Sequence, residues 1–224
     1  MGEMVEFEAN GGTANGYLAE PEGAGPGLVV LQEWWGLDDH IRDVCDRFAG
    51  EGFLALAPDL FHGETTEQPD EAKQKMMALN MDQAEKEMRG AVKYLLGHDQ
   101  SNGQVGSVGF CLGGGLSVWA ASVNPKVRAT VTYYYVMPHG KPDFASVQGP
   151  VLGHFGMADD FVSVDDAKAL EREMSDAGVD VDFEFYEGAG HAFFNDTNRF
   201  GTYDADAAQR SWKRTIEFLR SNLG

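Results

Sequence analysis

Apolar residues recur along the chain in short runs that are separated by longer amphipathic segments. Several runs are apolar at every position, as in strands covered by helices on both faces. A weaker alternating pair near the N-terminus predicts an antiparallel hairpin, Val5–Glu8 and Gly16–Ala19, joined by Asn10-Gly11-Gly12. The six stronger strand predictions are Leu28–Leu31, Phe53–Ala57, Val105–Phe110, Thr130–Tyr135, Val151–Phe155 and Val181–Tyr186.

Helical periodicity fills the intervals between these strands. Ile41, Val44, Cys45 and Phe48 fall at the i, i+3, i+4, i+7 spacing of one apolar helix face. Further helices are predicted over about Asp82–Leu96, Leu116–Ser122, Val164–Ala177 and Asp204–Leu223. The segment Gly63–Asn80 is compatible with a lid over a site or with a plain helix. Strand–helix alternation predicts an α/β fold with a mainly parallel central sheet and helices on both faces.

Length and composition narrow the classes of function. A chain of 224 residues suits a single domain over residues 1–224. Acidic residues number 36 against 17 basic ones, a formal net charge of −19, which disfavours nucleic acid and anionic membranes as partners. No run is long enough to span a membrane, and no basic-then-apolar leader begins the chain, so we expect a cytoplasmic protein, either a monomer or a small homo-oligomer.

The candidate chemistry does not involve a metal. The chain contains no CxxC or HExxH motif, and its histidines are scattered, so we expect neither a metal site nor a cofactor. The two cysteines, Cys45 and Cys111, would stay reduced in a cytosol. Cys45 lies on the apolar face of a predicted helix and is interpreted as a core residue.

Cys111 stands in a nucleophile elbow. The predicted strand Val105–Phe110 runs into Gly109-Phe110-Cys111-Leu112-Gly113, the G-x-nucleophile-x-G pattern with cysteine in place of serine. Side chains at the two flanking glycines would collide with neighbouring backbone in so sharp a turn. The turn places Cys111 at a helix N-terminus, which favours the thiolate. The backbone N–H of Leu112 can point at a developing oxyanion.

A base and an acid follow in the chain order of α/β-hydrolases. His191 lies in a glycine-rich loop after the last predicted strand, and Asp159 and Asp160 lie in the loop after Val151–Phe155. The pattern alone leaves open which aspartate orients the histidine. The other histidines lack a comparable context. Glu33 also stands out, because it is a carboxylate on the loop that leaves the first core strand, at the sheet edge where ligands bind.

Five segments together resemble the dienelactone hydrolase family, a branch of the α/β-hydrolases, and the resemblance covers nearly the whole chain. They are Gln32-Glu33-Trp34-Trp35-Gly36, Ala57-Pro58-Asp59-Leu60, the Cys111 elbow, Asp159-Asp160-Phe161-Val162 and Gly190-His191-Ala192-Phe193. The resemblance implies the α/β-hydrolase fold and a Cys111, Asp159 and His191 triad. It selects Asp159 over Asp160 because of the spacing to Phe161-Val162. It also implies that Glu33 holds the resting cysteine and that the Trp34 N–H is the second oxyanion donor.

The resemblance also defines candidate substrate-binding residues. Members that cleave dienelactones carry an arginine four residues after the histidine, and Asn195 occupies that position here. A second family arginine follows Ala-Pro-Asp-Leu, a region in which Lys73 or Lys75 is the available cation. An aromatic-lined pocket is suggested by five side chains near strand ends, Trp34, Trp35, Phe61, Tyr134 and Tyr135. The substrate-binding candidates are Trp35, Lys73, Tyr134 and Asn195.

The predicted function is hydrolysis of an ester or lactone through a covalent acyl-enzyme on Cys111. Thiolate is a good leaving group, so an intermediate that carries a poor alkoxide tends to revert. This favours enol lactones, such as dienelactones, and other activated esters. Two alternatives remain open. One is a broad carboxylesterase for small esters, and the other is a non-catalytic hydrolase fold that binds a ligand or senses oxidants through its thiol.

Overall fold

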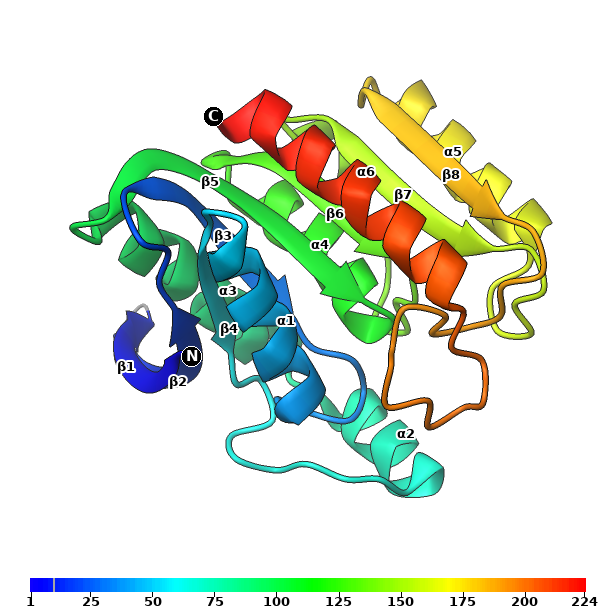
Figure 1. Ribbon diagram of the computed structural model, residues 1–224, viewed down its shortest axis with the longest axis horizontal. Coiled ribbons are helices and arrows are strands. Elements are labelled where there is room, and N and C mark those ends of the chain that lie inside the picture. Colours follow the sequence, from blue (N-terminus) through cyan, green and yellow to red (C-terminus); the bar gives the residue numbers. More distant parts are fainter. Residues whose placement is uncertain (10) are drawn as a thin grey trace.

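The computed structural model describes residues 1–9 and 11–224. Within these residues one sheet runs in the order β1-β2-β4-β3-β5-β6-β7-β8 (Figure 1). The strands are β1 (Glu3–Ala9), β2 (Gly12–Ala19), β3 (Gly25–Leu31), β4 (Leu54–Pro58), β5 (Ser101–Phe110), β6 (Val127–Tyr133), β7 (Val151–Gly156) and β8 (Val181–Tyr186). Strands β3 to β8 pair in parallel, whereas β2 pairs antiparallel with both β1 and β4.

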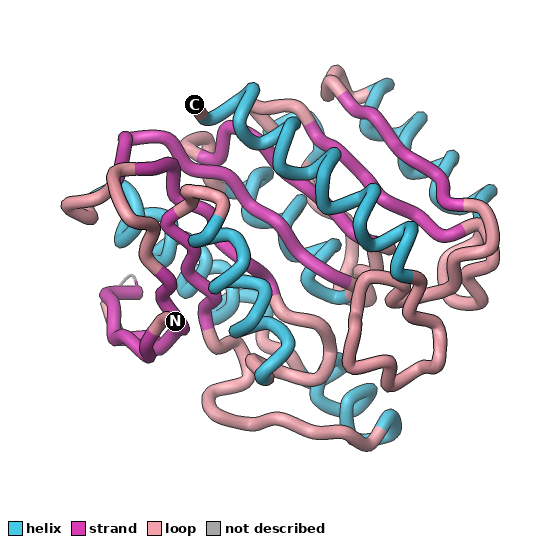
Figure 2. The backbone as a smooth tube through the Cα atoms, in the orientation of Figure 1, coloured by secondary structure: helices cyan, strands magenta, loops and turns pink. Residues whose placement is uncertain are grey.

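Helices cover both faces of this sheet. Helices α1 and α6 lie on the face nearer the viewer, and α3, α4 and α5 lie behind it (Figures 1 and 2). The helix bounds are α1 (Asp39–Gly50), α2 (Pro69–Ala78), α3 (Met81–Gly97), α4 (Leu112–Val123), α5 (Val164–Asp176) and α6 (Ala205–Leu223). The expected mainly parallel sheet with helices on both faces is therefore confirmed.

The bounds differ from the predicted ones where the hydrophobic pattern carries no signal. Helix α4 begins at Leu112, before the predicted Leu116, because the intervening glycines have no side chain to mark a helix face. Strand β6 ends at Tyr133, because Tyr134 turns away with a φ of 37°. The predicted hairpin corresponds to β1 and β2, but Asn10 of its turn lies outside the described residues. The segment predicted as lid or helix contains α2, which buries Ala72.

The core supports the carboxyl end of β5. The Phe110 ring, the last of that strand, stacks between Tyr133 at 4.7 Å and Phe194 at 5.2 Å between centroids. Each ring is fully or almost fully buried, so this end of the sheet is rigidly packed. Cys111 follows Phe110 directly, so its backbone extends from a rigidly packed strand end.

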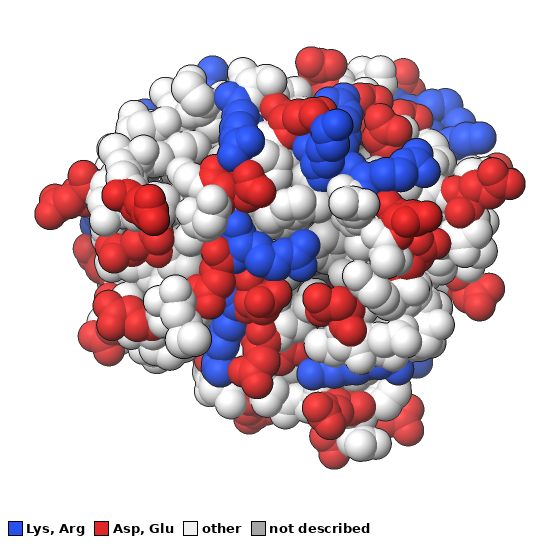
Figure 3. All heavy atoms as spheres, in the orientation of Figure 1, with Lys and Arg blue, Asp and Glu red and all other residues white. Residues whose placement is uncertain are grey.

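The surface is strongly acidic. On the face that carries α1 and α6, Asp and Glu side chains are spread widely, with fewer Lys and Arg side chains among them (Figure 3). None of the helices in the described part of the chain combines the length and the apolar character needed to cross a membrane.

Candidate active site

The backbone at Cys111 is strained and firmly held. Its φ of 55° and ψ of −116° lie in a region that non-glycine residues avoid, at a cost of roughly 1–3 kcal/mol. Its N–H donates to the carbonyl of Tyr133 at 3.1 Å, and its carbonyl accepts from the N–H groups of Gly114 at 2.9 Å and Val136 at 3.1 Å. These bonds from β6, α4 and the loop after β6 hold the turn, so the strained geometry is imposed by its surroundings.

The flanking glycines are required for steric reasons. A Cβ on Gly109 would overlap the carbonyl of Gly113, and a Cβ on Gly113 would overlap the carbonyl of Leu31. Both obstacles are backbone atoms, which cannot rotate away. The predicted collision is therefore present on both sides of the nucleophile position.

Gly109→Ala is expected to lower the free energy of unfolding by about 3 kcal/mol or more. This loss is at or above the upper end of the usual cost of overpacking, because the new methyl group can fit only if the backbone at Gly113 moves. Urea denaturation measures this. Gly97→Ala is the matched control, because a Cβ at the end of α3 meets no atom within 4 Å. Equal midpoints for the two variants would contradict the steric account of the elbow.

His191 and Asp159 form a buried pair. The Nδ1 atom of His191 lies 2.8 Å from Oδ2 of Asp159, and the two side chains are almost completely buried. The Oδ1 atom of Asp159 accepts from the N–H groups of Phe161 at 2.7 Å and Val162 at 2.9 Å, which fixes the carboxylate. Asp160 is exposed. Of the two aspartates left open by the pattern, the structure therefore brings Asp159 to the imidazole.

Cys111 lies close enough to His191 to act on its pKa. Burial alone would lower the pKa of His191, but the hydrogen bond with Asp159 and the proximity of Cys111, together with the charges of both groups, raise it to about 10. The imidazole therefore remains protonated at neutral pH when thiolate and carboxylate face it. Cys111 is 5% exposed and His191 4%, so the pair is shielded from bulk water. Cys45, by contrast, is fully buried in the core, as predicted.

Glu33 lies in a buried hydrogen-bond network. Its Oε1 accepts from the hydroxyl of Tyr134 at 3.2 Å, and its Oε2 accepts from the side-chain amide of Asn195 at 2.5 Å. Burial raises the pKa of Glu33, while the charge of His40 and the bond from Asn195 lower it. The resemblance implied that Glu33 holds the resting cysteine. Among the described residues the side-chain hydrogen bonds of Glu33 go to Tyr134 and Asn195, and none goes to Cys111.

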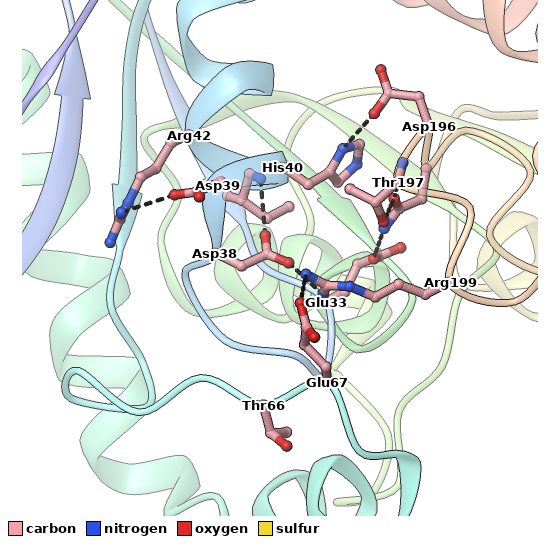
Figure 4. Close-up of polar contacts among 12 residues, drawn as sticks. Glu33, Asp38, Asp39, His40, Arg42, Thr66, Glu67, Asp196, Thr197 and Arg199 are labelled. Atoms are coloured by element: carbon pink, nitrogen blue, oxygen red, sulfur yellow. Dashed lines mark hydrogen bonds and ion pairs between the residues drawn. The ribbon is translucent and has the colours of Figure 1, made fainter.

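Sequence reasoning missed two side chains next to this network. His40 was interpreted as lacking a functional context, yet it is buried, its Nδ1 lies 3.2 Å from Oδ1 of Asp196, and its charge acts on Glu33 (Figure 4). Arg199 bonds Asp38 at 2.6 Å. Both contacts join residues more than 150 positions apart. No local pattern signals such contacts, and only the fold brings the partners together.

Aromatic rings enclose the imidazole. The Phe161 ring lies 4.7 Å from the His191 ring and 6.4 Å from Trp34, and Phe200 stacks on Trp34 at 5.9 Å. Phe161 is 59% exposed and is thus the outermost ring of the group. Trp35 packs beneath, with its ring 5.2 Å from that of Trp34. An aromatic-lined site was predicted, but neither Phe161 nor Phe200 was among its candidates.

The remaining candidates lie in different places. Leu112 opens α4, where N–H groups have no partner within the helix, and Trp34 follows β3 as a buried residue. Their oxyanion roles stay predictions. Lys73 is exposed on α2, and among the described residues it makes no hydrogen bond or ion pair with this site. Within the same residues, no cluster of three or more histidine, cysteine or acidic side chains is arranged to hold a metal ion.

Comparison with known proteins identifies the family. The model of the dienelactone hydrolase family matches residues 14–223. The chain belongs to the dienelactone hydrolase family. This membership confirms the family resemblance, the α/β-hydrolase fold and the expectation of a carboxylic ester hydrolase.

Relatives of this hydrolase match along their whole length. "Protein usf" of Aquifex pyrophilus is 37% identical and "Putative carboxymethylenebutenolidase" of Aquifex aeolicus is 32% identical, each over the whole of both chains. The crystal structure of a dienelactone hydrolase-like promiscuous phosphotriesterase from metagenomic libraries is 25% identical. It superimposes with a TM-score of 0.88, covering 100% of this chain and 99% of that one.

Proposed function

We propose that this hydrolase cleaves activated carboxylic esters or enol lactones through a Cys111, His191 and Asp159 triad and a thioester intermediate. The observation that carries the proposal is the strained Cys111 beside His191, an imidazole whose Nδ1 lies 2.8 Å from a buried carboxylate. Nucleophilic catalysis needs a nucleophile, a base and an orienting acid close to one another.

The reaction proceeds in two stages. Cys111 thiolate attacks the carbonyl carbon, and the backbone N–H groups of Leu112 and Trp34 stabilise the oxyanion. The C–O bond then breaks, and the leaving oxygen takes the proton from His191, which gives the acyl-thioester. His191 next removes a proton from water, the hydroxide attacks the thioester, and the thiolate departs as the acid is released. Asp159 holds the imidazole tautomer and stabilises the imidazolium in both stages.

The leaving group decides which esters react. In the first tetrahedral intermediate thiolate and alkoxide compete to depart, and thiolate is the better leaving group against a simple alkoxide. Productive cleavage therefore needs a stabilised oxygen leaving group, such as a phenolate or an enolate. The name "Putative carboxymethylenebutenolidase", carried by the Aquifex aeolicus relative, refers to an enol lactone and supports an enolate as the leaving group.

Glu33 is proposed to act through charge rather than by holding the thiol. The Tyr134 hydroxyl and the Asn195 amide hold its two oxygens, and its carboxylate interacts with the charge of His191. We infer that it stabilises the imidazolium that pairs with the Cys111 thiolate. Tyr134 and Asn195, which were substrate-binding candidates, are thereby assigned to positioning Glu33.

A panel of esters tests the proposed function. We expect 4-nitrophenyl acetate and an enol lactone to be hydrolysed with a kcat/KM at least about 100-fold above that of ethyl acetate, since only the first two release stabilised oxyanions. Comparable rates for all three would favour the broad carboxylesterase instead. Absence of any hydrolysis, with reversible peroxide oxidation of Cys111, would favour the thiol sensor.

A further inference from the structure

We propose that the site selects esters that carry no negative charge, with an aromatic leaving group packed against Phe161. This inference rests on the proposed function and names the substrate class of the same site. Two independent observations lead to it, the balance of charge in the network that includes Glu33 and Arg199 and the ring that lies exposed beside the imidazole.

Carboxylates outnumber cations in the network around the site. The carboxylates are those of Glu33, Asp38, Glu67, Asp159 and Asp196, whereas the groups able to carry positive charge are His40, His191 and Arg199. With both histidines protonated, five carboxylates still face three cations, and the two that make up the excess, Glu67 and Asp196, are 80% and 48% exposed to solvent. The whole chain, with its net charge of −19, adds repulsion at longer range.

The one arginine of this network is already neutralised. Arg199 donates to Oδ2 of Asp38 at 2.6 Å, and Glu67 lies 3.7 Å from its other terminal nitrogen (Figure 4). Its guanidinium lies 5.3 Å from the centre of the Trp35 ring, which connects it to the aromatic group beside His191. A substrate carboxylate would therefore have to compete with Asp38 for this cation, and two like charges would be brought together.

The exposed aromatic surface supplies the favourable contact. Phe161 lies against the His191 ring, and its 59% exposure leaves much of its surface free to pack on a ligand. During the first stage His191 must deliver a proton to the leaving oxygen. A phenolic leaving group is therefore brought to the same place as the Phe161 ring, where offset stacking is favourable.

A matched pair of substrates separates charge from shape. Methyl 4-nitrophenyl glutarate and hydrogen 4-nitrophenyl glutarate release the same phenol and differ in a terminal ester or carboxylate. At low ionic strength we expect kcat/KM to be about tenfold or more higher for the methyl ester, the size of effect that one uncompensated charge produces near a protein surface. The ratio should fall as salt screens the repulsion. Equal rates, or faster cleavage of the carboxylate, would overturn the inference.

Two neighbouring substitutions test the role of the paired arginine. Asp38→Asn removes the main partner of Arg199 while an asparagine can still cap α1, so it should raise the ratio of kcat/KM for the carboxylate to that for the methyl ester by about 3- to 10-fold. Asp39→Asn removes the same charge from an exposed side chain that pairs with Arg42, and should leave the ratio unchanged. Equal effects of both variants would contradict the local pairing. Failure of the wild type to cleave either ester above Cys111→Ala would refute the proposed function itself.

Discussion

Cys111→Ala is expected to lower kcat/KM for an aryl ester by about 10⁴-fold or more, because no other group can form the acyl intermediate. The release of 4-nitrophenol under pseudo-first-order conditions measures this. The oxyanion donors are backbone groups, so a small residual rate above the uncatalysed reaction should survive.

Cys45→Ala is the matched control for this loss. Cys45 is fully buried on α1, and burial raises the pKa of its thiol well above the ordinary value. Its removal should leave kcat/KM within about twofold, with a modest loss of stability from the smaller side chain. Loss of activity in Cys45→Ala, together with retention in Cys111→Ala, would reverse the assignment.

Asp159→Asn is expected to lower kcat by about 10³- to 10⁴-fold, because an amide can no longer stabilise the imidazolium or fix the reactive tautomer. It should also lower the pKa of His191, since the hydrogen bond and the charge of Asp159 are among the groups that raise it to about 10. NMR titration of the His191 ring protons follows the pKa, and steady-state kinetics follow the rate.

Asp160→Asn isolates the effect of position from the effect of charge. It removes the same charge from the next residue, which is exposed and is not the carboxylate bonded to His191. We expect near-normal kcat and an unchanged pKa of His191. Similar losses in both variants would indicate that the loop as a whole, rather than the Asp159 carboxylate, supports the reaction.

The elements and the elbow could be predicted because their signals are local. Runs such as Val105–Phe110 are apolar on both faces, and Gly109 and Gly113 mark a turn that only glycine permits. Cys111, Asp159 and His191 stand in the chain order of α/β-hydrolases. Each follows a predicted parallel strand, so the three could be expected to meet at one edge of the sheet. Within this triad, only the choice between two adjacent aspartates needed the resemblance, and the structure shows Asp159 beside the imidazole.

The network behind the triad could not be predicted, because its contacts are non-local. Glu33 bonds Asn195 across 162 positions, and His40 reaches Asp196 across 156. Such pairs depend on how the loop between β8 and α6 folds over the loop after β3. Its position on the loop after the first core strand, together with the family resemblance, identified Glu33 as a candidate, but its partners follow from packing. For the same reason Arg199 could not be recognised as an ion-paired side chain.

Trapping the acyl-enzyme tests the central claim most directly. 4-Nitrophenyl trimethylacetate carries a hindered acyl group that slows attack by water, so the intermediate should accumulate. Rapid acid quenching followed by peptide mass analysis should find one acyl group per chain on Cys111, with a matching burst of 4-nitrophenol. An acyl group on any other residue, or an equal burst from Cys111→Ala, would contradict the account.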